Sequence, residues 1–184
     1  WLEENGLEPN GYYLAVGRFV PENNYETMIR EFMASGTDRA FALVTGVDEG
    51  FLDELEKRTG FRSDPRIRFV GTVYDQELLK KIRENAFAYL HGHEVGGTNP
   101  SLLEALASTR LSLLLDVGFN REVAEGAALY WTKEAGSLIR LIMRVESVDD
   151  QEANVFRELS REMIRVRYSW NLVVSSYEKL FLEN

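Results

Sequence analysis

The sequence predicts a doubly wound α/β domain, in which helices cover both faces of a parallel sheet. Short apolar runs alternate with stretches of helical periodicity along almost the whole chain, and the links between them are short. This alternation is typical of a parallel sheet, because a connection between parallel strands usually carries a helix. No internal repeat, linker or low-complexity stretch interrupts the pattern, so residues 1–184 are expected to form one domain.

The first half of the chain alternates strands with helices. Met28, Ile29 and Phe32 fall on one face of the first helix, as expected for a helix packed on a sheet. Gly60 is expected to end the second helix, and Asp75 is the expected N-cap of the third. Strands are expected at residues 12–16, 40–45 and 67–70, and helices at residues 24–35, 51–59 and 75–85.

The second half continues the pattern and ends in helices. Strands are expected at residues 86–91, 111–115 and 128–131, and a helix begins near Asn99 or Pro100. From Gly136 onward the periodicity is helical, with a break at residues 168–170. Several aromatic residues are expected to pack these C-terminal helices onto the sheet, namely Trp131, Tyr168, Trp170, Tyr177 and Phe181.

Composition limits the classes of function. The chain has 184 residues, of which 45% are hydrophobic, and a formal net charge of −9. So acidic a surface repels nucleic acid and anionic membranes, although backbone N–H groups can still hold a small phosphate locally. Cysteine is absent, which excludes disulfides and thiolate metal sites and fits the cytoplasm. No apolar run approaches the roughly 18 residues that span a bilayer. The first residue is Trp1 rather than Met, so we expect a piece of a longer protein.

The richest candidate site is the segment HGHEVGGTNPSLLEAL, residues 91–106. In an open α/β sheet the ligand lies at the carboxyl ends of the strands, and this segment joins a strand to a helix. Its glycines allow a close approach to a ligand, and the N-terminus of the following helix favours phosphate. Glu104, about one turn inside that helix, is placed to accept both hydroxyls of a ribose. An ordinary capped helix with a solvated Glu104 explains the pattern equally well.

Other strand ends give weaker signals. Arg18, after the first strand, can neutralise a diphosphate with its fork of donors or pair with a nearby glutamate. Residues 70–75 either present free backbone to a planar base or form an ordinary turn. His91 and His93 are expected to point to opposite faces of their strand end, and one of them to contact a sugar. With Glu94 they make too small a ligand set for a metal, so no metal is expected.

The whole chain resembles the C-terminal domain of GT-B-fold retaining glycosyltransferases of family 4. The resemblance is carried by Gly17-Arg18, by the loop and helix that end in Glu104, and by the stretches LLLDVGFNREVAEGAALYW and WNLVVSSYEKLF. PENNYETMI and GGTNPSLLEAL are similar to bacterial rhamnosyltransferases that build capsule and cell-wall polysaccharide.

This resemblance implies a role for each candidate residue. Arg18 would contact the donor diphosphate, Glu104 the ribose and Val73 the base. Arg18 and Glu94 are the expected catalytic residues. The remaining expected contacts to the nucleotide-sugar are Gly17, Asn23, His93, Gly96, Gly97, Thr98, Asn99, Pro100, Ser101 and Leu102, and the backbone of residues 97–102 would cradle the phosphates.

The sequence departs from the broad family at two positions. Asn23 stands where the family usually has a Lys, and Gly96 stands where it has a Glu that touches the donor sugar. Glu94, two residues before Gly96, is a candidate replacement for that Glu. Both departures recur in the narrower rhamnosyltransferase group, so they support that subgroup.

The expected function is therefore that of a hexosyltransferase donor domain. It would bind a nucleotide-diphospho-sugar, with dTDP-rhamnose as the best candidate, and would need no cofactor. The resemblance implies an N-terminal domain that binds a polysaccharide or lipid-linked acceptor, so the chain alone is expected to be inactive. The full-length protein is expected in the cytoplasm or peripherally at the inner face of the plasma membrane. Two alternatives remain, an epimerase-like GT-B domain and a non-catalytic nucleotide-binding module.

Overall fold

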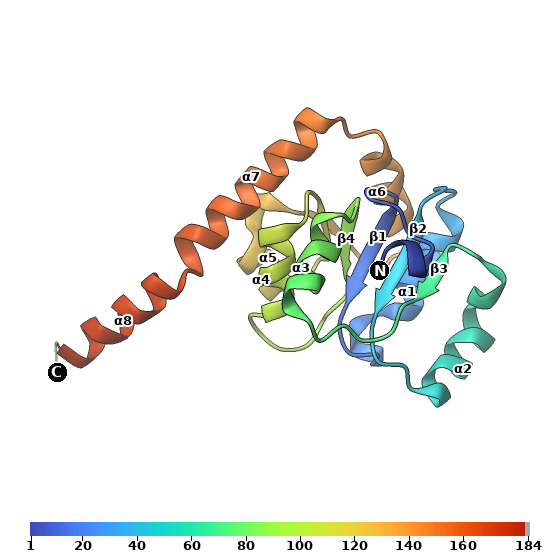
Figure 1. The fold of residues 1–184 in the computed structure, drawn as a ribbon, viewed down its shortest axis with the longest axis horizontal. Coiled ribbons are helices and arrows are strands. Elements are labelled where there is room, and N and C mark those ends of the chain that lie inside the picture. The colour runs from blue at the N-terminus through green and yellow to red at the C-terminus, as the bar shows by residue number, and fades with distance from the viewer. Residues whose placement is uncertain (183–184) are drawn as a thin grey trace.

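A six-stranded parallel sheet forms the centre of the molecule, as predicted (Figure 1). The computed structural model describes residues 1–182. The strands lie in the order β3-β2-β1-β4-β5-β6. The chain adds β2 and β3 on one side of β1 and then β4, β5 and β6 on the other, so the order of the strands reverses between β1 and β4. They are β1 (Tyr12–Val16), β2 (Ala40–Val44), β3 (Ile67–Phe69), β4 (Ala88–His91), β5 (Ser112–Leu115) and β6 (Leu129–Trp131).

Helices cover both faces of the sheet. Successive side chains of a strand point to opposite faces, so each face has its own apolar cluster. Tyr13 and Ala15 of β1 belong to the apolar cluster beneath α1, α2 and α6. Tyr12 and Leu14 face the opposite side, where α3 and α4 pack. The helices are α1 (Tyr25–Ala34), α2 (Glu49–Thr59), α3 (Gln76–Glu84), α4 (Pro100–Ser108), α5 (Gly118–Ala124), α6 (Ser137–Glu146), α7 (Asp150–Arg167) and α8 (Trp170–Leu182).

Side-chain caps define where several helices begin. The Asp75 carboxylate accepts hydrogen bonds from the N–H groups of Glu77 and Leu78, which confirms it as the N-cap of α3. Asn99 caps α4 through the N–H of Ser101, at 2.9 Å, and Pro100 takes the first helical position. Gly60, in the left-handed region with φ +67°, ends α2 as predicted.

The sequence pattern missed two features of the second half. Residues 118–124 form the short helix α5 between β5 and β6, a helix that the sequence pattern did not predict. The C-terminal helical stretch also has a break that was not predicted, at residues 147–149, where Asp149 caps α7. The predicted break near Tyr168 is present, because α7 ends at Arg167 and α8 begins at Trp170.

The expected packing of the C-terminal aromatic residues is only partly right. Trp131 is fully buried in the core and Tyr168 packs against a small cluster under α7. Tyr177 and Phe181, however, are 62% and 76% exposed, because α8 projects away from the sheet (Figure 1). The side chain of Trp170 lies outside the described residues. Within residues 1–182, no helix has the length and apolar character to cross a membrane.

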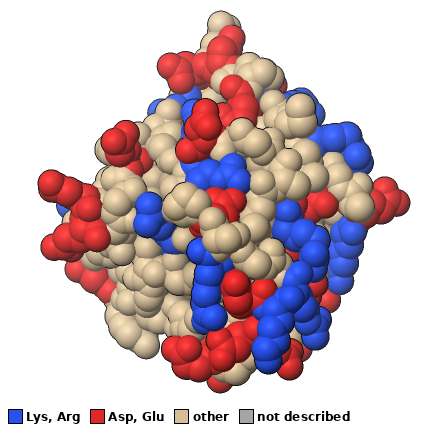
Figure 2. Space-filling model, turned by 90° about the vertical axis from the view of Figure 1, so that its right-hand side faces the viewer, with Lys and Arg blue, Asp and Glu red and all other residues tan. Residues whose placement is uncertain are grey.

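Charges on the face that carries α2 are of both signs. Figure 2 shows Lys and Arg side chains with Asp and Glu side chains among and around them. Arg58 contacts Glu26 and Glu54, and Arg62 contacts Asp53, so these two arginines are used in ion pairs. Exposed pairs of this kind contribute little to stability.

Candidate functional site

The reversal of strand order places the candidate site between β1 and β4. These central strands pair in parallel, with Tyr13 opposite Ala88 and Leu14 opposite Tyr89. Their carboxyl ends therefore lie side by side, and open α/β sheets bind ligands at such a reversal. Arg18 follows β1, and the loop of residues 92–99 follows β4. The structure thus brings together segments that are far apart in the sequence.

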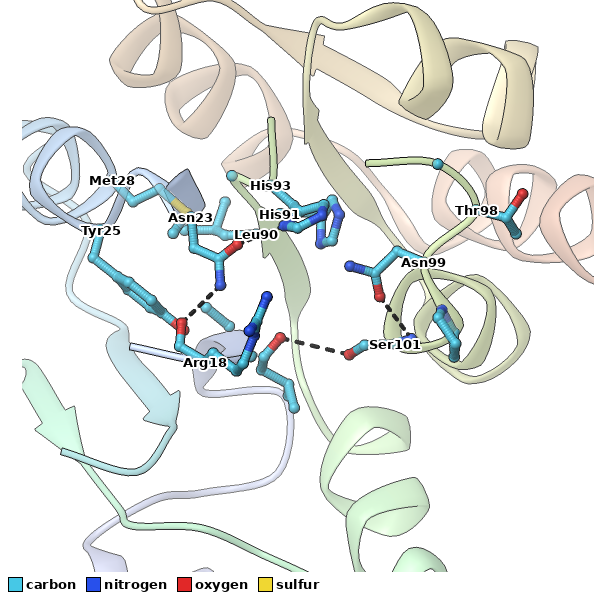
Figure 3. Close-up of a pocket in the computed structure, with 16 residues that line it drawn as sticks. Arg18, Asn23, Tyr25, Met28, Leu90, His91, His93, Thr98, Asn99 and Ser101 are labelled. Carbon is cyan, nitrogen blue, oxygen red and sulfur yellow. Dashed lines mark hydrogen bonds between the residues drawn. The ribbon is translucent and has the colours of Figure 1, made fainter. Parts of the chain in front are cut away.

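The first hollow at this edge has a volume of about 370 Å³. Tyr25 and Met28 form part of its apolar wall, while His91, His93 and Asn99 supply polar groups (Figure 3). In Figure 3 the Asn99 side chain points across the hollow toward the histidines. The predicted site residues that line it are Gly17, Arg18, Asn23, His93, Gly97, Thr98, Asn99, Pro100 and Ser101.

Hydrogen bonds tie the loops after β1 and β4 to each other. Asn23 Oδ1 lies 2.7 Å from His93 Nδ1, and Asn23 Nδ2 donates to the carbonyl of Arg18 at 2.7 Å. Asn24 Nδ2 donates to the carbonyl of Gly92 at 2.8 Å. The predicted contact residues Asn23 and His93 are therefore partners of each other, and both side chains are held in place at the wall of the hollow.

Gly92 is required by the close approach of these loops. A Cβ atom at this position would lie 2.3 Å from the carbonyl oxygen of Asn23, a distance that real side chains do not adopt. Gly97 differs, because a Cβ there would meet nothing within 4 Å. Gly92 thus allows the loops after β1 and β4 to approach each other closely, while the space around Gly97 is open.

His91 is a site residue that the sequence analysis did not assign to the ligand. It lines the first hollow, is only 4% exposed, and its Nε2 has no hydrogen-bond partner. Burial, and to a lesser extent the nearby His93, lowers the pKa of His91 to about 3, so its imidazole is neutral at neutral pH. The expectation that His91 and His93 face opposite sides is wrong. Residues two apart in an extended segment share a face, and both rings line the same hollow, with centroids 5.9 Å apart.

Unpaired backbone donors lie just before α4. Within residues 1–182, the N–H groups of Gly97, Thr98 and Asn99 donate to no protein atom. The N–H of Ser101 is already taken by the Asn99 side chain, and that of Leu102 by the Asn99 carbonyl. Leu102 is also fully buried and does not line the hollow. Of the predicted phosphate-binding residues 97–102, the first three therefore have N–H groups that are free to bind a ligand.

A second hollow of about 490 Å³ lies on the other side of Arg18. Val73 and Glu104, the predicted base and ribose contacts, both line it. Gly17, Arg18 and Ser101 line both hollows, so the hollows meet at the end of β1. Together they make one groove, and Arg18 borders both of its parts.

Arg18 is exposed and takes part in no ion pair in the described part of the chain. The alternative of a surface arginine paired with Glu22 or Glu26 is not observed, since Glu26 contacts Arg30 and Arg58 instead. The guanidinium therefore remains available to a ligand at the point where the hollows meet.

Glu94 and Gly96 lie outside the lining of both hollows. The Glu94 carboxylate pairs with Lys133, and this hydrogen bond is the main cause that lowers the pKa of Glu94. Gly96 has φ +116°, in the region that disfavours any residue with a Cβ. The backbone thus explains why a glutamate is absent at position 96. A catalytic role for Glu94 stays a prediction.

The described residues contain no group of three or more His, Cys, Asp or Glu side chains that is arranged to hold a metal ion. The polar groups of the first hollow are instead amides, imidazoles, hydroxyls and backbone N–H groups around Arg18. Such a set suits an anionic ligand that carries hydroxyl groups.

Comparison with known proteins gives structural matches. No protein-family profile matches the sequence, and no curated protein matches it. Solved structures do match in fold. A glycosyltransferase from Rickettsia africae superposes with a TM-score of 0.85 at 14% identity, over 99% of this chain and 50% of that one. The HepE protein of Anabaena, in complex with UDP and glucose, gives 0.85 at 15% identity, over 100% of this chain and 51% of that one.

Sucrose-phosphate synthase from Thermosynechococcus elongatus gives a TM-score of 0.80 at 19% identity, over 100% of this chain and 49% of that one. The chain has the fold of one half of a GT-B glycosyltransferase. It spans about half the length of these matched structures. At such low identity the GT-B likeness concerns the fold, and a function must be inferred from the residues of the groove.

Proposed function

We propose that this GT-B half binds the nucleotide-sugar donor of a glycosyltransferase. The observation that carries the proposal is the pair of hollows that meet at Gly17, Arg18 and Ser101. A nucleotide-diphospho-sugar has the matching order of parts, with a nucleoside, a central diphosphate and a sugar. The matched structure of HepE, in complex with UDP and glucose, supports this class of ligand.

Each part of the groove suits one part of the donor. Val73 and Glu104 border the second hollow, where the base and the ribose, or the deoxyribose of a dTDP donor, would lie. The diphosphate would lie between the Arg18 guanidinium and the free N–H groups of residues 97–99, since both favour negative charge. The sugar would then occupy the first hollow, where Asn23 and His93 offer hydrogen bonds to hydroxyl groups.

The finer assignment follows the resemblance of the sequence to rhamnosyltransferases. We propose dTDP-rhamnose as the donor, transferred with retention of configuration to a polysaccharide or lipid-linked acceptor that an N-terminal domain binds. Arg18 and the free N–H groups would stabilise the charge that develops on the departing diphosphate.

Calorimetry with UDP, dTDP, GDP and dTDP-rhamnose tests the donor site. A dissociation constant between micromolar and millimolar is expected for at least one ligand, or roughly −4 to −8 kcal/mol. Arg18→Ala should weaken binding, whereas Arg62→Ala, which removes an arginine that lines neither hollow, should not. Absence of heat with every nucleotide at millimolar concentration would refute the proposal.

A transfer assay separates a donor half from a complete enzyme and from a non-catalytic module. The isolated chain should show no transfer of labelled sugar, because orientation of both substrates is missing, an effect that can reach about 7–11 kcal/mol. Fusion to the acceptor-binding half should restore transfer, and Arg18→Ala should then lower kcat more than donor affinity. Transfer by the isolated chain would show that the acceptor site lies within these residues, and failure of the fused protein would favour a binding module.

A further inference from the structure

Arg83 is a buried cation beside the second hollow. Its side chain, from the last turn of α3, is only 3% exposed. Its Nη2 atom lies 2.8 Å from Glu104 Oε2 and 3.3 Å from Ser101 Oγ, so it contacts α4 at both positions. Arg83 also lines the hollow itself. A buried guanidinium is stable only when paired, and here its ion pair goes to the carboxylate proposed to bind the ribose.

Glu104 by itself is a poorly fixed group. Its side chain is 48% exposed, and within residues 1–182 its Oε1 has no protein partner. A long, half-exposed carboxylate samples several rotamers, and ordering it would oppose ligand binding. It also carries a negative charge close to the proposed diphosphate position at Arg18. The contact with Arg83 reduces both penalties, because it restricts the side chain and compensates the charge.

We propose that Arg83 is a positioning residue for the donor ribose. It holds Glu104 through Oε2, leaves Oε1 to accept a ribose hydroxyl, and offsets the Glu104 charge so that carboxylate and diphosphate are accommodated together. This inference rests on the proposed function of the groove and assigns a role to a side chain that does not itself contact the hydroxyl. Arg83 also donates a hydrogen bond to Ser101, so it restrains the first turn of α4 as well, where the hollows meet.

The discriminating measurement is the ratio of two affinities. UDP is compared with 2′,3′-dideoxy-UDP, and dTDP with its 3′-deoxy analogue, by calorimetry on the intact chain. The unmodified protein should favour the hydroxyl-bearing nucleotide by roughly tenfold or more, the range of a charge-assisted hydrogen bond. Arg83→Met should reduce this ratio to within about twofold. Glu104→Gln should do the same, and the double variant should show no further reduction.

Controls separate positioning from simple support of the fold. If Arg83 only joins α3 to α4, Arg83→Met will weaken both nucleotides of a pair equally and keep the ratio, and that result overturns the inference. Arg62→Met, which removes an exposed arginine, should change neither affinity. Arg83→Lys keeps the buried charge but not the fork, so it should fold and give an intermediate ratio. This variant decides the question if Arg83→Met does not fold.

The same experiment distinguishes this inference from the proposed function. If the unmodified protein binds no nucleotide at millimolar concentration, the proposed function fails and the inference fails with it. If it binds both members of each pair equally, the ribose role of Glu104 and the positioning role of Arg83 are overturned, while nucleotide binding stands. If it discriminates and Arg83→Met or Arg83→Lys discriminates equally well, the positioning role alone is overturned.

Discussion

Protonation of His91 should couple the stability of the fold to pH. Burial, with His93 as the smaller cause, lowers the pKa of His91 to about 3 from its ordinary value of 6.5. In the unfolded chain the imidazole returns to the ordinary value. Between these pH values the unfolded state therefore binds a proton that the folded state excludes. Acid should destabilise the protein in this window, because a lowered histidine pKa makes proton binding favour unfolding.

The size of the effect follows from the shift. His91 causes no loss well above pH 6.5, and each pH unit below that value costs about 1.4 kcal/mol until the pH approaches the folded pKa. Between pH 7 and pH 5 the loss from His91 is about 2 kcal/mol. For a domain of this size that corresponds to a fall of about 4–8 °C in Tm.

His91→Phe isolates this contribution. The substitution keeps a ring against Tyr89, whose centroid lies 5.8 Å from that of His91, and removes a buried Nε2 that has no partner. Urea unfolding at pH 7 and pH 5 should show that the unmodified protein loses about 2 kcal/mol more than the variant. Met28→Leu, an apolar change in the same hollow, should retain the full dependence. Equal losses in His91→Phe and the unmodified protein would refute a buried, neutral His91.

Other substitutions probe the packing around the groove. Gly92→Ala should destabilise the fold by about 1–3 kcal/mol and weaken nucleotide binding, because its Cβ would strike the Asn23 carbonyl. Gly97→Ala should leave the stability unchanged within about 0.5 kcal/mol, and equal effects of the two substitutions in urea unfolding would contradict this. Glu31→Gln should cost about 1–3 kcal/mol, since the buried carboxylate accepts N–H bonds from Gly136 and Ile139 at the start of α6, and an unchanged Tm would argue against that cap. Asn99→Ala should cost about 1 kcal/mol by removing the α4 cap, measured in the same way, and a gain in stability would be inconsistent with it.

Local patterns were sufficient for most of the fold. The run at residues 12–16 was predicted with its observed bounds because β-branched and aromatic residues there are bounded by glycine. Asp75 and Gly60 marked helix ends through interactions with their own neighbours. The helix α5 was missed because its seven residues are too few to establish a helical period. The contacts of the α8 aromatic residues were misjudged because apolar periodicity does not say which surface a helix meets.

The candidate site was predictable only where it follows from a strand end. Arg18 and the loop before Asn99 were found because strands precede them. The position of Arg83 is visible in the sequence, since it lies four residues after Leu79, on the apolar face of α3. An arginine in such a position must be paired after folding. Its partner Glu104 could not be named, because that contact joins separate helices.

The sequence by itself determined the class of fold, the order of its elements and the positions of Gly17-Arg18 and of the α4 cap, because each depends on residues near one another in the chain. The tertiary structure alone decided that β1 lies beside β4, which makes the hollows meet at Arg18. It also decided that His91 is buried without a partner, that Glu94 pairs with Lys133, and that Arg83 reaches Glu104. These facts depend on distances between segments far apart in the chain, and such distances are set by how the helices and strands pack together.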